Sequence, residues 1–215
     1  VFTRHQDILE DKKILFDEMF HSIVLFEGEH PLDQLINQLK DKKSFDKVPN
    51  LIYVKNGEVV RNTSAKALSY DQLACPNFDD LPLNKYLMPY PVLPYMASRG
   101  CYWGKCTFCT HSFIYDSHYR KENEERVAEE LDYLGKRYKT KYFTFSDEAI
   151  SPNAFDRMSK AILSQGVEMR ALGMLKFESD SIETVELFKN MYKAGFLMLF
   201  FGLESANDRI LSIIE

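Results

Sequence analysis

Three cysteines lie within nine residues of this chain: Cys101, Cys106 and Cys109, separated by four and then two residues. Thiolates bind iron–sulfur clusters, and three of them on one loop can hold three irons of a cubane cluster while the fourth iron stays open. Gly100 and Gly104 would let the backbone bend around such a cluster. Because an enzyme needs an open iron and a pure electron carrier does not, this spacing predicts a catalytic iron–sulfur site.

Two other kinds of site could use the same cysteines. A structural zinc ion would need a fourth ligand, which His111 or Cys75 could supply. Zinc ribbons, however, usually carry two paired cysteine knuckles, whereas this sequence has a single tight triplet. An electron-transfer protein would need a fourth cysteine, and Cys75 is the only candidate. A zinc-stabilised binding module and a simple iron–sulfur electron carrier are therefore the alternatives to an enzyme.

The elements that must position the cysteines alternate between strand and helix from residue 93 onward. This alternation predicts parallel strand–helix–strand units with right-handed crossovers. Four such units form half of a TIM-type barrel or part of an open sheet. The cysteine segment follows the first strand directly, at the end where barrels place their active sites. Strands are expected at 93–98, 141–147, 168–175 and 197–203, and helices at 122–138, 153–165, 181–194 and 206–214.

The chain before residue 93 has a different composition. Residues 1–63 predict an α/β unit, and the proline-rich residues 64–92 predict a linker with little regular structure. The elements expected in the first unit are a helix at 7–20, a buried strand of the parallel type at 22–26, a helix that begins near Pro31, and a hairpin with its turn at Asn56-Gly57.

Composition and charge exclude several classes of protein. The net charge of −5 and the lack of a basic stripe argue against nucleic acid as a partner. The sequence contains no apolar run long enough for a transmembrane helix, which needs about 18 residues or more. A tight cysteine triplet without a signal peptide points to a reducing cytoplasm. The chain starts without Met and stops within an amphipathic pattern, so we interpret both ends as cuts.

The cysteine segment resembles the radical S-adenosylmethionine (SAM) superfamily. Its usual motif has three and then two residues between the cysteines, with an aromatic residue before the last one. Cys106-Thr107-Phe108-Cys109 matches the second half, and the first spacing is one residue longer here. The preceding Ser-Arg-Gly resembles the members that carry an N-terminal cobalamin-binding domain, and Glu27-Gly28-Glu29 is similar to the last part of that domain.

This resemblance implies a fold and a division of the chain. Residues 1–63 would be the C-terminal part of a Rossmann-like, cobalamin-binding-type domain, and 93–215 the N-terminal half of a radical SAM partial barrel. The cofactors would be a 4Fe–4S cluster and S-adenosylmethionine. The resemblance leaves cobalamin binding open, because none of His5, His21 and His30 lies in a DxHxxG pattern.

The resemblance also implies which strand ends hold SAM. Phe108 would pack near the adenine or the cluster, Lys176 would meet the SAM carboxylate, and the Gly-Leu-Glu-Ser ending of the last strand would place Glu204 and Ser205 at the cofactor. The second strand end would contribute Ser146, Asp147 and Glu148.

Each of these roles has a simpler alternative. Lys176 could be solvated, and Glu204 could be solvated beside a helix-capping Ser205. The acids of the second strand end could instead favour the start of the next helix at Ser151 or Asn153.

The implied activity is reductive cleavage of SAM to begin radical chemistry on a small-molecule or peptide substrate. An external donor such as flavodoxin or ferredoxin would supply the electron. Methylation, ring rearrangement and thiomethylation all use this core, and only the cobalamin-type resemblance favours methyl transfer. The sequence assigns no catalytic residue, and the chain alone could bind a cluster without turning over.

Overall fold

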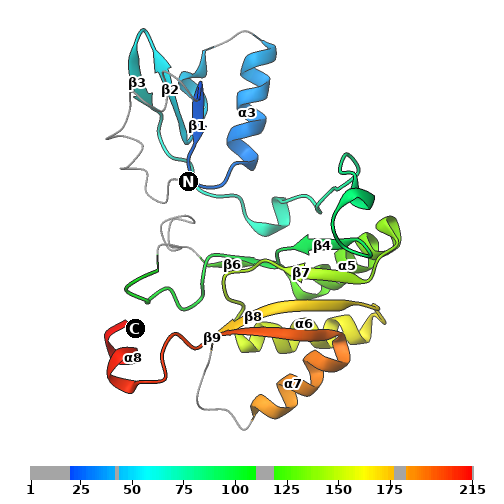
Figure 1. Ribbon diagram of the computed structural model, residues 1–215. Helices are drawn as coiled ribbons and strands as arrows, with labels where there is room; N and C mark the ends of the chain where they lie inside the picture. The colour runs from blue at the N-terminus through cyan, green and yellow to red at the C-terminus, as the bar shows by residue number, and fades with distance from the viewer. Residues whose placement is uncertain (1–19, 42–43, 110–118, 177–182, 215) are drawn as a thin grey trace. The chain divides into compact units, whose positions relative to one another are not determined.

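The computed structural model describes residues 20–41, 44–109, 119–176 and 183–214 (Figure 1). The chain divides into two compact units, and the division along the sequence falls between Ser69 and Tyr70. Among the described residues, no helix is both long enough and apolar enough to cross a membrane. The predicted helix at 7–20 lies outside the described residues.

The first unit contains a three-stranded antiparallel sheet in the order β1-β2-β3. Asn56 and Gly57 both adopt positive φ, 55° and 81°, which suits a two-residue hairpin turn and confirms that prediction. Val48 and Leu51 are fully buried in this unit. Its elements are β1 (Ser22–Val24), α3 (Glu29–Lys40), a short 3₁₀ helix (Phe45–Lys47), β2 (Leu51–Lys55) and β3 (Glu58–Arg61).

The prediction for residues 22–26 was wrong in strand type. β1 pairs antiparallel with β2, with Ser22 opposite Tyr53, and its residues are only partly buried. The strand is also shorter than predicted, because Phe26 leaves the extended conformation with a φ of 61°. An apolar run indicates burial but not strand direction, so the sequence signal could not separate the two arrangements.

The second unit is built on a four-stranded parallel sheet in the order β4-β7-β8-β9. The strands neighbour one another in chain order, as the predicted alternation requires, and this part of the prediction is confirmed. The strands are β4 (Val92–Tyr95), β7 (Tyr142–Phe145), β8 (Arg170–Lys176) and β9 (Phe196–Gly202), and the helices are α5 (Glu124–Tyr138), α6 (Pro152–Ser164), α7 (Glu183–Ala194) and α8 (Asp208–Ile214).

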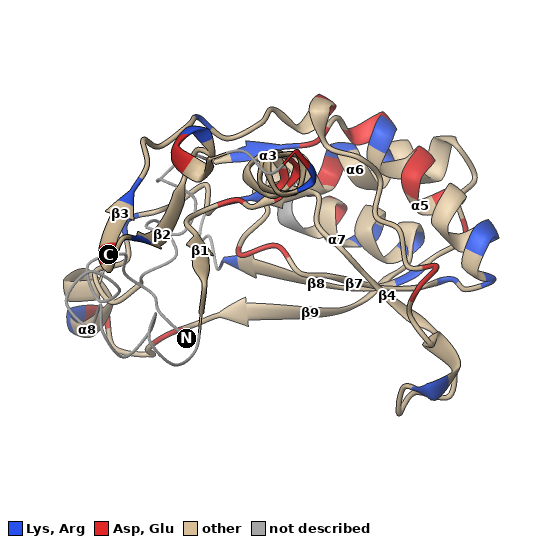
Figure 2. Cartoon of the chain, turned by 90° about the horizontal axis from the view of Figure 1, so that it is seen from above, with Lys and Arg blue, Asp and Glu red and all other residues tan. Residues whose placement is uncertain are grey.

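Helices α5, α6 and α7 cover one face of this sheet, with acidic and basic residues interspersed along α5 and α6 (Figure 2). Exposure alternates along β8: Ala171 and Leu175 are buried, whereas Met174 is exposed and Lys176 is half-buried. Successive side chains of a strand point to opposite faces, so Lys176 belongs to the face that the helices leave uncovered. The large core residues include Leu93, Leu131, Phe143, Phe155, Ile162, Met191 and Phe196.

A small two-stranded sheet brackets the cysteine segment. β5 (Ser98–Arg99) pairs antiparallel with β6 (Arg120–Lys121). Cys101 follows β5 and forms a parallel bridge with Ala149, which lies beyond the end of β7. The first part of the second unit, residues 70–91, contains only two short 3₁₀ helices, at Tyr70–Gln72 and Leu83–Lys85.

Candidate metal centre

The cysteine loop begins at the C-terminal end of β4. Cys101, Cys106 and Cys109 are partly buried, and none of them is in a disulfide. The Cys109 amide donates to the Cys106 carbonyl at 3.1 Å, so these two residues form one tight turn. Gly100 and Gly104 have φ values of 80° and 64°, a conformation that glycine adopts without strain. The two predicted bending positions are therefore the places where the loop changes direction.

Charged groups from three strand ends gather around Cys106. Burial is the first cause that raises the pKa of this thiol, and the negative charges of Cys101, Cys109 and Glu204 raise it further, while Lys176 lowers it. The loop after β4, the end of β8 and the segment after β9 therefore meet at one place. The structure brings together five of the residues that the sequence predicted for the site.

The three cysteines suit a cubane cluster, because three thiolates on one loop can each bind a different iron. Within the described ranges, no group of three or more His, Cys, Asp or Glu side chains is arranged to hold one metal ion. A tetrahedral zinc ion needs four ligands that converge on one point, whereas a cubane cluster binds each cysteine through a different iron. A bound cationic group, whether a zinc ion or the iron–sulfur core, would offset the repulsion among three ionised thiols.

The fourth ligands considered for zinc or an electron carrier have other positions. Cys75 packs against the main core of the second unit, and burial raises its pKa to about 11. The charged neighbours of Cys75 are Glu130 and Arg126, not the triplet. His111 lies outside the described residues. Cys75 is therefore not part of the group of charges around Cys106.

Trp103 is a member of the site that sequence reasoning missed. The ammonium group of Lys176 lies 3.8 Å from the centroid of its ring, and that of Lys105 lies 4.6 Å away. Both distances are within the range of cation–π contacts. The signal that could have found it is the single tryptophan of the chain placed between two cysteines and beside a lysine.

Glu204 has a strained backbone and a side chain that folds back over β9. Its φ is 56°, in the left-handed region. A Cβ atom added at Gly202 would lie 2.8 Å from Glu204 Oε1, so the carboxylate would have to move to make room for it. The carboxylate of Glu204 thus lies close over the backbone of Gly202.

The alternative in which Ser205 caps the last helix is wrong. α8 begins at Asp208, and the Asn207 side chain accepts a hydrogen bond from the Ile210 amide at 3.2 Å. Ser205 Oγ instead accepts from the Asn207 amide at 3.1 Å, in the turn before the helix. Both residue types cap helices well, and the one nearer the first turn holds the cap.

The three polar residues after β7 have different environments. Ser146 is exposed, and its hydroxyl donates to the Tyr95 carbonyl at 3.3 Å. Asp147 is only 3% exposed, and burial raises its pKa to about 7 while its hydrogen bonds act in the opposite direction. Glu148 is partly buried. The cap of the next helix is Ser151, whose hydroxyl accepts from the Ala154 amide, as one alternative predicted.

The far part of the cysteine loop contacts the last helix. The Thr107 amide donates to the Ile214 carbonyl at 2.9 Å, and its hydroxyl to the Ile213 carbonyl at 3.4 Å. These carbonyls lie in the last turn of α8, where helix carbonyls need partners from outside the helix. Phe108, the next residue, is 56% exposed, so its ring is open to a ligand.

Comparison with known proteins relates the chain to the radical SAM superfamily. Residues 95–215 match the family model described as the radical SAM superfamily. The "uncharacterized methyltransferase PH0819" of Pyrococcus horikoshii is 31% identical over 201 residues, which cover 90% of this chain and 42% of that protein. The 4'-phospho-dehydrooxetanocin synthase of Priestia megaterium is 26% identical over 220 residues, which cover 90% of this chain and 29% of that protein.

Solved structures share the fold. OxsB, a cobalamin-dependent SAM radical enzyme solved with aqua-cobalamin and SAM, has a TM-score of 0.75 at 21% identity, over 95% of this chain and 31% of its own. The radical SAM methyltransferase TsrM from Kitasatospora setae has a TM-score of 0.64 at 14% identity, over 89% of this chain and 39% of its own. The chain thus spans less than half of each relative. The predicted α/β fold class, with part of a radical SAM barrel, is confirmed.

Proposed function

Because this chain belongs to the radical SAM superfamily of enzymes, we propose that Cys101, Cys106 and Cys109 hold a 4Fe–4S cluster and that SAM binds at its open iron. When bound, the cluster and SAM supply one-electron reductive cleavage of a C–S bond and a 5′-deoxyadenosyl radical. The observation that supports this proposal is the meeting of the three thiols with Lys176 and Glu204 at the C-terminal ends of parallel strands.

The chain's own residues would bind and orient SAM. Lys176 would pair with the SAM carboxylate, and Glu204 would accept from the amino group or the ribose hydroxyls. The exposed ring of Phe108 would cover the adenine. Ser146, Glu148 and Ser205 would complete the polar contacts at their strand ends.

The substrate and the cobalamin are proposals for the whole protein. We infer methyl transfer to a small-molecule or peptide substrate from the names of the similar proteins, with an electron donor such as flavodoxin or ferredoxin in the cytoplasm. One histidine of the first unit, His30, lies on α3, and its Nε2 is 3.1 Å from Gln34 Nε2. This ring nitrogen already has a hydrogen-bond partner within its own helix, so His30 adds no support for a cobalt ligand. No step of the proposed function depends on a cobalt ligand in this chain.

The decisive experiment is anaerobic reconstitution with iron and sulfide, followed by EPR of the reduced protein with and without SAM. We expect a 4Fe–4S signal that changes when SAM is added and that is lost in Cys106→Ala. Cys75→Ala is the matched control and should keep both the signal and its response. A colourless protein that holds one zinc ion, or a signal indifferent to SAM, would contradict the proposal.

A further inference from the structure

Asp147 is a buried carboxylate whose oxygens are already bonded. Oδ1 accepts from the Ser98 amide at 2.5 Å and from the Ser98 hydroxyl at 2.6 Å, and Oδ2 accepts from the Ala97 amide at 3.2 Å. Burying a carboxylate costs free energy unless such donors compensate for the lost water. The side chain therefore has a strong physical reason to stay where these three donors are.

The donors belong to the segment that leads into the cluster loop. Ala97 and Ser98 follow β4 and precede Cys101 by four and three residues. The same segment is held on its other side, because the Ala97 carbonyl accepts from the Glu122 amide at 2.8 Å and Ser98 pairs with Lys121 in the small sheet. Asp147 supplies the link from this segment to the end of β7.

The same two segments are joined a second time at Cys101. Two residues beyond Asp147, Ala149 forms the parallel bridge with Cys101. The bridge and the three hydrogen bonds run in step along the two segments, so a shift of Ser98 against Asp147 would also shift Cys101 against Ala149. The other two cysteines are held differently, since Thr107 beside Cys106 bonds to the end of α8.

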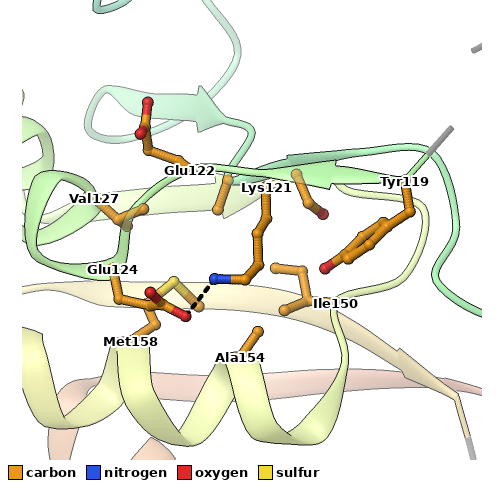
Figure 3. A pocket seen from close by; sticks show the side chains of 10 residues that line it. Tyr119, Lys121, Glu122, Glu124, Val127, Ile150, Ala154 and Met158 are labelled. Carbon is orange, nitrogen blue, oxygen red and sulfur yellow. Dashed lines mark hydrogen bonds and ion pairs between the residues drawn. The ribbon is translucent and has the colours of Figure 1, made fainter. Parts of the chain in front are cut away.

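The segment also borders a small pocket. A small pocket is lined by Ala97 and Ser98 together with residues of β6 and α6, and Figure 3 shows Tyr119, Lys121, Ile150 and Met158 around it. Lys121 reaches along the pocket to its ion pair with Glu124, at 2.6 Å. Ala97 and Ser98 are themselves buried, so the hydrogen bonds to Asp147 hold the segment in addition to its packing.

We propose that Asp147 is a positioning residue, which fixes Cys101 as a cluster ligand by binding the Ala97 and Ser98 amides and the Ser98 hydroxyl. This inference rests on the proposed function, and it gives Asp147 a task other than direct contact with SAM. Groups that orient metal ligands without touching the metal typically change metal affinity by about 10–100-fold when they are replaced. Asp147 should therefore influence the cluster before any SAM is present.

The test compares Asp147→Asn, Ser98→Ala and the control Asp156→Asn in the reconstituted chain. Asn has the size of Asp, but its NH₂ group cannot accept from a backbone amide. Ser98→Ala removes one of the three donors. Asp156 lies on α6, where it bonds to Lys160 and Asn190, so its replacement measures the general cost of losing a carboxylate.

We expect Asp147→Asn to release iron to a chelator about 10-fold faster than the unchanged protein, and to shift the g-values of the reduced cluster in the absence of SAM. Ser98→Ala should act in the same direction by a smaller factor, and Asp156→Asn should match the unchanged protein in both measurements. If Asp147→Asn does not fold, the Ser98→Ala result decides.

Two outcomes would overturn the inference. Asp147→Asn could keep the signal and the iron release of the unchanged protein while its response to SAM weakens, which would make Asp147 a SAM ligand. Alternatively, Ser98→Ala and Asp147→Asn could both show the iron release and g-values of Asp156→Asn, which would mean that the hydrogen bonds of Asp147 do not affect the cluster. A failure of the proposed function can be told apart from a failure of this inference. It would be seen in the unchanged protein, which would bind no cluster or give an EPR signal that does not change when SAM is added.

Discussion

At the β4–β7 side of the sheet, Asp147 is buried and accepts three hydrogen bonds, whereas at the β9 side Glu204 is exposed and has a left-handed backbone conformation. The hydrophobic residues follow the same division. Phe143 on β7 is 2% exposed, and Phe200 on β9 is 50% exposed. The β7 side is thus held by its own contacts, whereas β9 is the edge strand of this four-stranded sheet and its side chains are largely exposed.

The largest expected effect tests this difference in packing. Phe143→Ala should lower the free energy of unfolding by about 3–5 kcal/mol, because it removes a buried ring and leaves a cavity. Phe200→Ala should lower it by about 1 kcal/mol or less, since half of that ring already meets water. Urea unfolding can be followed by the fluorescence of Trp103, the only tryptophan in the chain. Equal losses in the two variants would show that β9 is as firmly packed as β7.

The next prediction concerns the space at Gly202. Gly202→Ala should weaken SAM binding about 10-fold, because the new Cβ would lie 2.8 Å from Glu204 Oε1 and must displace that carboxylate. Gly28→Ala is the control, since an added Cβ there meets nothing within 4 Å. Calorimetric titration of the reconstituted protein with SAM measures both. Unchanged affinity in Gly202→Ala would remove Glu204 from the SAM site.

Features of the two sides that depend on residues close together in the chain could be predicted from the sequence, and features that depend on residues far apart could not. The strand–helix alternation and the cysteine loop were predictable, because apolar spacing and ligand spacing are local signals. The two functions of an acid at a strand end were not separable: a SAM ligand and an anchor for Ser98 require the same residue type at Asp147. The contact of Trp103 with Lys176 joins residues far apart in the chain, and no local pattern announces it.

The division of the chain into domains and the contacts of individual residues with SAM stay predictions. The sequence also allowed a cap of the last helix at Ser205 as an alternative, because Ser and Asn are both good capping residues and only the folded turn selects Asn207. Errors of this kind are small shifts along the chain. They leave the order of elements intact, and that order is what brings the three strand ends together.

A smaller effect is expected from the backbone of Glu204. A non-glycine residue in a left-handed conformation costs about 1 kcal/mol or more. Glu204→Gly should therefore be more stable than Glu204→Ala by about 1 kcal/mol, while both variants lose the carboxylate and bind SAM equally weakly. Urea unfolding of the apoprotein measures the difference. Equal stability of the two variants would mean that Glu204 is not strained before SAM binds.

The smallest expected effect concerns how Lys176 is held at the proposed SAM site. Trp103→Phe keeps an aromatic face for the ammonium group, whereas Trp103→Leu keeps only bulk. A cation–π contact at a partly exposed site contributes about 0.5–1 kcal/mol, so Trp103→Leu should bind SAM about 2–5-fold more weakly than Trp103→Phe. Calorimetric titration measures the ratio, and repeating it in a Lys176→Met background provides the control, in which the two Trp103 variants should bind alike. A ratio that persists without Lys176 would show that the indole contacts SAM itself, and the SAM site would then be organised by an aromatic surface rather than by a positioned charge.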